Sequence, residues 1–359
     1  MLLVFQRRHH EKKRSMEFRK LGTTDIDVSV ICLGTMTWGE QNTEGEAHEQ
    51  LSFAVDQGIN FIDTAELYPV PARGETHGRT EAYIGTWLNQ RGKRDDLILA
   101  SKICGPGPYT KHIREDNDYS ARSIEEALNK SLKRLQTDYL DLYQIHWPAR
   151  ATNFFGSRGY YHREGWENNI QEILEGLEKV IKAGKVRYVG ISNETPWGMM
   201  EYLKNSAARG LPRIQSVQNP YNLLNRTYEV GLAEMSIREK AGLLAYSPMA
   251  FGFLSGKYHK GMDQPKDRIN QFSSMARYKS DQCHLATAKY LEIAEKYDLS
   301  LAQMSLAWVN QQKFLTANII GATSMEQLKE NIDSIHVKLD KQIIKEINSI
   351  HSAIPNPAP

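Results

Sequence analysis

Eight short apolar segments recur along this chain, and stretches with the pattern of helices separate them. Helix-like stretches end at Gly58, Gly92, Gly184, Gly210 and Gly242, and glycine favours the left-handed conformation that ends a helix. Strands that alternate with helices pair in parallel, so the sequence predicts an α/β fold. The eight apolar segments are VICLGTM (30–36), NFIDTA (60–65), LILASK (97–102), DLYQIHW (141–147), VRYVGIS (186–192), IQSVQN (214–219), LLAYSP (243–248) and ANIIGATS (317–324).

Eight parallel strands could form a closed barrel or an open, doubly wound sheet. The open sheet that binds dinucleotides carries a G-x-G-x-x-G turn after its first strand. No such turn is present, and GPGPY from Gly105 lacks the third glycine and opens no helix. The sequence therefore predicts a (β/α)8 TIM barrel. Residues 17–30 read as an N-terminal β-hairpin that closes the barrel floor, and two extra C-terminal helices are expected.

Two helix starts can be placed from capping residues. In SIEEALNKSLKRLQ (123–136), Ser123 and Glu126 have the spacing of a capping box. Thr195 precedes Pro196, and proline is favoured at the first position of a helix. The sequence therefore predicts helices that begin after Ser123 and after Thr195.

The composition excludes several classes of protein. The 359 residues include 45 Lys and Arg against 43 Asp and Glu, for a formal net charge of +2, and the basic residues form no stripe that would bind nucleic acid. No apolar run approaches the roughly eighteen residues of a membrane-spanning helix. The three cysteines have no C-x-x-C spacing, which disfavours disulfides and a zinc site and indicates a cytoplasmic protein.

The first 15 residues, MLLVFQRRHHEKKRS, differ from the rest of the chain. Their apolar run is short and precedes the basic residues, which is the reverse of a secretory signal. We predict a disordered N-terminal tail at 1–15 and a single barrel domain at 16–359.

The barrel prediction indicates where the active residues should lie, because active sites of such barrels are formed at the C-terminal ends of the strands. Four ionisable residues meet this expectation. Asp63, Lys102 and His146 end three successive apolar segments, and Tyr68 lies in the loop after Asp63. Each alone has a structural explanation, such as loop capping or core packing. Together they suit proton delivery to a carbonyl: an ammonium group lowers the pKa of a nearby phenol, and a carboxylate can pair with that ammonium.

The same residues resemble the catalytic tetrad of the aldo-keto reductase family. GKVRYVGISN (184–193), VQNPYN (217–222) and YSPMAFGFLSGKY (246–258) are similar to segments of that family. DTAELYPVP (63–71) and the long loop after His146 resemble its bacterial Tas-like branch. The resemblance covers about residues 17–350. It implies NADPH-dependent reduction of aldehydes and ketones to alcohols, with Tyr68 as general acid and Asp63, Lys102 and His146 as the other catalytic residues.

The resemblance also implies NADPH, rather than NADH, held across the barrel mouth. Many reductases carry an arginine where this chain has Gln327, so Lys257 and Arg268 are the candidates for the 2′-phosphate. The residues expected to contact the cofactor are Thr35, Met36, Trp38, Asp63, Ser192, Asn193, Gln218, Tyr246, Ser247, Pro248, Met249, Leu254, Gly256, Lys257, Arg268, Gly321, Thr323, Ser324, Gln327, Glu330 and Asn331.

The substrate is expected to be a small carbonyl compound bound by Trp38, Tyr68, His146 and Trp147. The loop at 148–169 is long and aromatic, which suits either a wall of an apolar pocket or a contact with another subunit. No membrane or nucleic-acid partner is expected, and oligomerisation stays open. No metal is expected, because no ligand set has metal-binding spacing.

Two other functions remain open at this stage. A Schiff-base aldolase on the same barrel would use Lys102 as nucleophile. A regulatory subunit with slow turnover, similar to potassium-channel β subunits, would keep the tetrad and the bound nucleotide.

Overall fold

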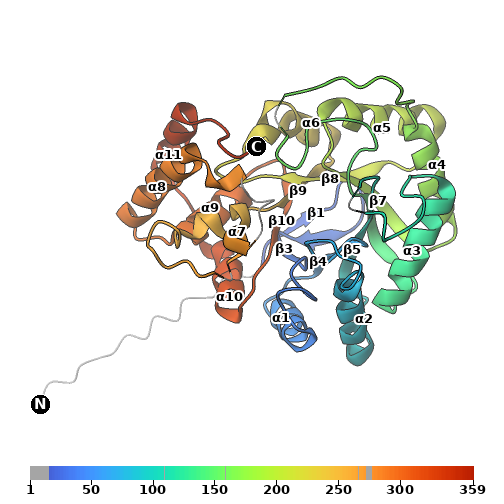
Figure 1. Ribbon diagram of the computed structural model, residues 1–359, viewed down its shortest axis with the longest axis horizontal. Helices are drawn as coiled ribbons and strands as arrows, with labels where there is room; N and C mark the ends of the chain where they lie inside the picture. Colours follow the sequence, from blue (N-terminus) through green and yellow to red (C-terminus); the bar gives the residue numbers. More distant parts are fainter. Residues whose placement is uncertain (1–15, 109, 158, 266, 272–276) are drawn as a thin grey trace, which may run out of the picture.

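The computed structural model describes residues 16–108, 110–157, 159–265, 267–271 and 277–359, and it contains a closed barrel of eight parallel strands (Figure 1). The predicted (β/α)8 barrel is confirmed. The predicted tail, residues 1–15, lies outside the described residues. The strands close in the order β10-β3-β4-β5-β6-β7-β8-β9. Their bounds are β3 Ile31–Gly34, β4 Phe61–Asp63, β5 Ile98–Ile103, β6 Leu140–Ile145, β7 Val186–Ser192, β8 Ile214–Pro220, β9 Gly242–Tyr246 and β10 Leu315–Ile320.

The predicted hairpin closes one end of the barrel. Strands β1 (Phe18–Lys20) and β2 (Asp27–Ser29) pair antiparallel. Leu21 and Val28 are buried and pack in one cluster with Phe61 and Leu142, which are barrel residues. Arg19 donates hydrogen bonds to three backbone carbonyls around the start of β10. The floor is therefore joined to the barrel by apolar packing and by backbone hydrogen bonds.

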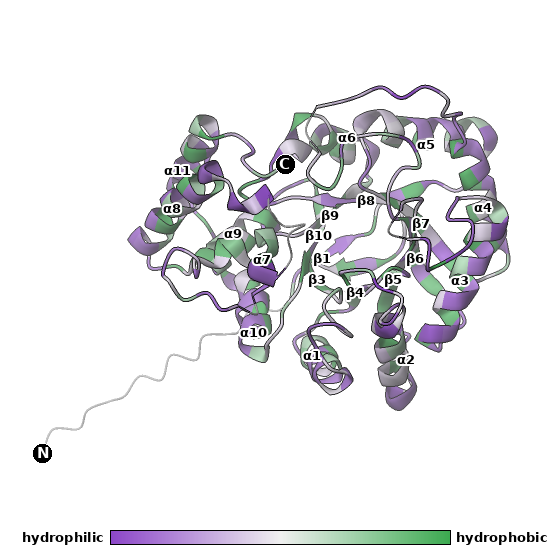
Figure 2. Ribbon diagram, in the orientation of Figure 1, coloured by the Kyte–Doolittle hydropathy of each residue, from purple (hydrophilic) through white to green (hydrophobic). Residues whose placement is uncertain are grey.

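Helices surround the barrel, and α8, α9 and α11 gather on one side of it (Figure 1). Figure 2 shows hydrophobic residues along the strands and hydrophilic ones on the outward faces of the helices, as expected for helices that pack on a barrel. Two helices, α10 and α11, follow the last strand, as predicted. The helix bounds are α1 Glu44–Asp56, α2 Arg79–Arg91, α3 Ala121–Leu135, α4 Ile170–Lys182, α5 Pro196–Arg209, α6 Leu232–Glu239, α7 Arg268–Gln271, α8 Asp281–Lys296, α9 Leu301–Asn310, α10 Met325–Asp333 and α11 Lys341–Ala353, with 3-10 turns η1 Thr227–Val230, η2 Ala250–Ser255 and η4 Ser334–His336.

Four of the five predicted glycine helix ends have the left-handed conformation, and the fifth does not. Gly92 and Gly210 cap α2 and α5 with φ of 75° and 67°. At the end of α6, Lys240 takes that conformation instead, with φ of 50°. Gly242 begins β9, where a Cβ atom would lie 2.1 Å from Oγ1 of Thr316. The expectation for Gly242 was wrong: this glycine permits close packing of β9 against β10 and does not end a helix.

One predicted helix start was also wrong. Helix α3 begins at Ala121, and Ser120 is its N-cap, accepting a hydrogen bond from the Ser123 amide. Glu126 instead pairs with Lys130 one turn further on, so the proposed capping box does not form. The predicted start of α5 is confirmed, because Thr195 caps it and Pro196 is its first residue.

None of the helices in the described parts of the chain has both the length and the apolar character needed to cross a membrane.

Candidate active site

The four predicted catalytic residues meet at the C-terminal end of the barrel. Asp63 is the last residue of β4, Lys102 lies in β5, and His146 directly follows β6. The Lys102 Nζ atom lies 2.6 Å from Oδ2 of Asp63 and 3.4 Å from the hydroxyl oxygen of Tyr68. All four side chains are buried. Adjacent parallel strands thus bring together residues that are far apart in the sequence.

Further hydrogen bonds satisfy the buried ion pair. Lys102 Nζ also donates to the carbonyl oxygen of Thr64, at 2.8 Å. The second carboxylate oxygen of Asp63 accepts from Gln218 Nε2 at 2.8 Å and from Gln144 Nε2 at 3.3 Å. A buried ion pair is tolerated only when such additional partners compensate for the lost hydration. The ammonium group is therefore held in one place beneath the phenol.

The pKa of Tyr68 differs from the sequence-based expectation. Burial raises the pKa of the phenol, and the positive charge of Lys102 lowers it by less than burial raises it. For Lys102, burial acts to lower the pKa, but attraction to Asp63 and Tyr68 outweighs burial and raises it. The expected lowering of the Tyr68 pKa is thus corrected for this structure. At neutral pH the pair consists of a neutral phenol and a charged ammonium group.

His146 completes the group as a neutral imidazole. Burial, with a smaller effect of the Lys102 charge, holds its pKa well below the usual value. Its ring lies edge-on to the Tyr68 ring, with centroids 5.9 Å apart, and packs on Trp147 at 4.9 Å. The Nδ1 atom is buried and has no hydrogen-bond partner among the described residues. The imidazole lines the cavity at the barrel mouth, where a ligand can reach it.

The sequence analysis missed a second buried ion pair, between Glu66 and Arg114. Glu66 is two residues before Tyr68, and its other carboxylate oxygen accepts from the Cys104 amide at 2.9 Å. Arg114 also donates to the carbonyl oxygen of Cys104, at 3.1 Å. The pair ties the loop that carries Tyr68 to the end of β5, which carries Lys102. The sequence did carry a signal for this pair, because Glu66 is a second acidic residue in the otherwise largely apolar segment FIDTAELY (61–68).

A cavity of about 650 Å³ opens above these residues at the barrel mouth. Apolar side chains that include Leu67, Val70, Phe155 and Phe251 form much of its wall. The predicted residues that line it are Thr35, Met36, Asp63, Tyr68, His146, Ser192, Asn193, Gln218, Tyr246, Ser247, Pro248, Met249, Lys257, Arg268, Gly321, Thr323, Gln327, Glu330 and Asn331.

Five predicted contact residues lie outside the cavity lining. Trp38 is fully buried, and its Nε1 donates to Gln50 Oε1 at 3.1 Å, so it packs against α1. Trp147 is 1% exposed and donates from Nε1 to the carbonyl oxygen of Pro106. Trp147 therefore supports His146 from behind and does not face the cavity. The other three are Leu254, Gly256 and Ser324.

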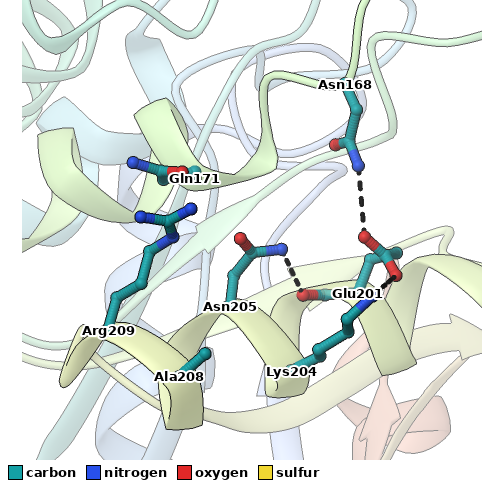
Figure 3. A pocket seen from close by; sticks show the side chains of 7 residues that line it. All are labelled: Asn168, Gln171, Glu201, Lys204, Asn205, Ala208 and Arg209. Atoms are coloured by element: carbon teal, nitrogen blue, oxygen red, sulfur yellow. Dashed lines mark hydrogen bonds and ion pairs between the residues drawn. The ribbon is translucent and has the colours of Figure 1, made fainter.

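A second hollow of about 540 Å³ lies on the outer surface between α4 and α5 (Figure 3). Two of its three charged side chains are paired with neighbours, since Glu201 accepts hydrogen bonds from Asn168 at 3.2 Å and Lys204 at 3.5 Å. It contains none of the four catalytic candidates. In the described parts of the chain, no cluster of three or more His, Cys, Asp or Glu side chains is placed to hold a metal ion. The chemistry is accordingly assigned to the barrel mouth.

Comparisons with known proteins agree with this geometry. Residues 30–352 match the family described as the Aldo/keto reductase family. The chain belongs to this family. It is 48% identical over 350 residues to Protein tas of Escherichia coli (strain K12), a match that covers 96% of this chain and 100% of that protein. The resemblance to the Tas-like branch is confirmed.

More distant relatives of the chain carry names of oxidoreductases. The chain is 34% identical to the uncharacterized oxidoreductase YrpG of Bacillus subtilis (strain 168), over 93% of this chain and 96% of that protein. It is 26% identical to norsolorinic acid reductase B of Dothistroma septosporum (strain NZE10 / CBS 128990), over 94% of this chain and 82% of that protein. The protein is an oxidoreductase of a family that generally uses nicotinamide cofactors.

Polar groups at the ends of β7, β8 and β9 suit the amide end of such a cofactor. Asn193 donates to the carbonyl oxygen of His146 at 2.9 Å and accepts from the Tyr246 hydroxyl at 2.6 Å. Asn193 and Ser247 have positive φ angles of 55° and 53°, a conformation that non-glycine residues adopt rarely. These residues therefore hold the Tyr246 ring at the cavity wall.

The opposite end of the cavity is a helix start. Gln327 Oε1 accepts from the amide and the hydroxyl of Thr323, and Asn331 donates to the carbonyl oxygen of Gly321 at 3.1 Å. A Cβ atom added at Gly321 would meet no atom within 4 Å. The backbone there is open to close approach by a ligand, and the N-terminus of α10 favours negative charge.

Proposed function

We propose that this enzyme reduces aldehydes and ketones to alcohols with NADPH as the hydride donor. The observation that carries the proposal is the position of the Lys102 ammonium, 3.4 Å from the Tyr68 hydroxyl and 2.6 Å from Asp63. Bound NADPH supplies a hydride to the carbonyl carbon. The protein must then supply a proton to the carbonyl oxygen, and Tyr68 is the acid that faces the cavity.

The three neighbours of Tyr68 each have a part in the proton transfer. The neutral ring of His146 hydrogen-bonds the carbonyl oxygen and orients it toward the phenol. Once Tyr68 has given up its proton, the fixed charge of Lys102 stabilises the phenolate without any reorganisation. Asp63 keeps Lys102 charged and in place. A Schiff-base role for Lys102 is disfavoured, because its ammonium group is fully buried and bonded to Asp63 and Thr64.

The chemistry of the cavity fits a nicotinamide dinucleotide. Tyr246 offers a ring for stacking, and Ser192, Asn193 and Gln218 present amide and hydroxyl groups at one end. Nε and Nη2 of Arg268 are buried without a partner among the described residues, as expected of a cation that awaits an anionic ligand. The guanidinium group of Arg268 and the ammonium group of Lys257 suit phosphate oxygens. Both residues line the same cavity.

The test is consumption of NADPH in the presence of 4-nitrobenzaldehyde, for the wild type and for Tyr68→Phe. A positioned general acid typically contributes ~10²–10⁴-fold, so kcat should fall by that factor. NADPH affinity, measured by fluorescence titration, should stay unchanged. Full activity in Tyr68→Phe would refute the assignment of the acid. A wild type that binds NADPH and turns over no carbonyl compound would favour the regulatory subunit instead.

A further inference from the structure

Most charged side chains that line the cavity already have a partner. The Nζ atom of Lys257 lies 2.6 Å from Oδ1 of Asp267, and Glu330 accepts a hydrogen bond from Ser300 at 2.7 Å. Asp63 is paired with Lys102. The two ion pairs are neutral overall, whereas Glu330 keeps its negative charge.

Two arginines depart from this pattern. Arg268 and Arg277 both line the cavity, and neither forms an ion pair with a carboxylate in the described parts of the chain. The Nε atom of each is buried and lacks a hydrogen-bond partner there. Burial lowers the pKa of Arg268 to about 10, which shows the cost of leaving that charge uncompensated. With Lys102 included, the cavity has four basic and three acidic residues, so its net charge is +1, and the two arginines are the basic residues that form no ion pair among the described residues.

Arg277 lies at the substrate end of the cavity. A Cβ atom added at Gly156 would be 3.0 Å from Cδ and 3.1 Å from Nη1 of Arg277, so the arginine packs on the loop after β6. The preceding residue in that loop, Phe155, lines the cavity and contacts Trp147 with ring centroids 5.8 Å apart. Trp147 in turn packs on His146. This chain of contacts leads from Arg277 to the imidazole.

Arg277 lines the same cavity as Tyr246, the residue that we assign to nicotinamide stacking. Burial raises the pKa of Tyr246, and the positive charge of Arg277 opposes that rise. This electrostatic effect agrees with the place of both residues in one cavity lining. The guanidinium group also lies over the ring of Tyr278, with Cζ 5.0 Å from the ring centroid.

We propose that Arg277 binds a carboxylate group of the substrate, and that the enzyme prefers carbonyl compounds carrying such a group on an apolar or aromatic frame. The proposal rests on the proposed reductase function. A guanidinium group matches the planar geometry of a carboxylate and can bind both of its oxygens. Leu67, Val70 and Phe155 supply the apolar wall for the frame. The phosphates of the cofactor are left to Arg268 and Lys257.

The experiment compares the three positional isomers of carboxybenzaldehyde with their neutral methyl esters. For at least one isomer, wild-type kcat/KM should exceed that of its ester by about 10- to 100-fold, the factor typical of hydrogen bonds to charged groups. Arg277→Met should remove that preference and leave kcat/KM for the esters within about threefold. Arg277→Lys should restore part of it. Lys260→Met removes one charge from an exposed pair outside the cavity and should retain the wild-type preference.

Binding provides a readout that does not depend on turnover. With NADP⁺ present, the carboxybenzyl alcohol of the preferred isomer should raise the unfolding temperature of the wild type more than that of Arg277→Met. Equal kcat/KM for every acid and its ester in the wild type would overturn the proposal while leaving the reductase intact. An equal loss on acids and esters in Arg277→Met would also overturn it. Failure to reduce any aldehyde would instead count against the proposed function.

Discussion

The Nζ atom of Lys102 lies 2.6 Å from Oδ2 of Asp63, with side-chain exposures of 0% and 2%. On the surface, Lys130 and Glu126 make a pair at the same distance of 2.6 Å, with exposures of 48% and 42%. The two pairs differ chiefly in their access to water. Burial therefore decides how much stability is lost when one partner of each pair is removed.

Lys102→Met should destabilise the protein by about 3–5 kcal/mol, because it leaves the Asp63 carboxylate buried without its cation. Asp63→Asn combined with Lys102→Met removes both charges and should cost less than Lys102→Met alone. The free energy of unfolding, measured by urea denaturation, should be determined for the single and the double variant. Lys130→Met is the matched control and should change that free energy by no more than about 1 kcal/mol. Similar losses for Lys102→Met and Lys130→Met would contradict this account of the buried pair.

Removal of the Tyr246 ring should weaken NADPH binding. Tyr246→Ala should lower the affinity by about 10- to 100-fold, since stacking on an aromatic ring contributes about 1–3 kcal/mol. Tyr246→Phe keeps the ring and loses only the 2.6 Å hydrogen bond to Asn193, so its loss should be smaller. Fluorescence titration with NADPH gives both values.

Tyr188→Ala is the control for the Tyr246 variants. Its hydroxyl donates to Asp25 in the floor hairpin, at the end of the barrel opposite the cavity. NADPH affinity should be unchanged in this variant. If Tyr246→Ala bound NADPH as tightly as the wild type, Tyr246 would not be the stacking ring.

Stability should fall in mild acid because of His77. Burial, with the charges of Arg134 and His112, lowers the folded-state pKa of His77 to about 4. The unfolded chain takes up the proton as the pH falls below about 6.5, whereas the folded protein does so only near pH 4. Folding stability is thus lost between these values. The side chain is partly exposed, so we expect the loss to be about 1–2 kcal/mol after allowance for solvent screening.

His77→Gln should reduce the difference in unfolding free energy between pH 7 and pH 4 by that amount. The buried imidazole of His146 acts in the same direction and should account for part of the remaining difference. His162→Gln changes a histidine in an exposed loop and should leave the pH dependence as it is in the wild type. An unchanged pH dependence in His77→Gln would show that its proton uptake is the same in both states.

The sequence alone predicted the barrel, the three strand-end residues and Tyr68 in the loop after the first of them, since all follow from local patterns. The alternation of apolar segments with capped helices specifies parallel strands, and the strand ends then have to meet at one edge. Residues that cap helices through backbone conformation, such as Gly92 and Gly210, were also predictable. Gly242 was not, because its need for a small side chain arises from contact with Thr316 in a distant strand.

Tertiary structure decided which side chains face the cavity and what charge they carry. Trp38 and Trp147 are aromatic residues near the barrel mouth and were expected to contact ligands, yet both side chains are buried in the core. The direction of the Tyr68 pKa depends on the balance of burial against the Lys102 charge, and burial is a property of the whole fold. Arg277 lies far along the chain from His146, and no local pattern marks it. Its place in the cavity lining depends on the packing of a loop after β9 on the loop after β6, which carries Phe155.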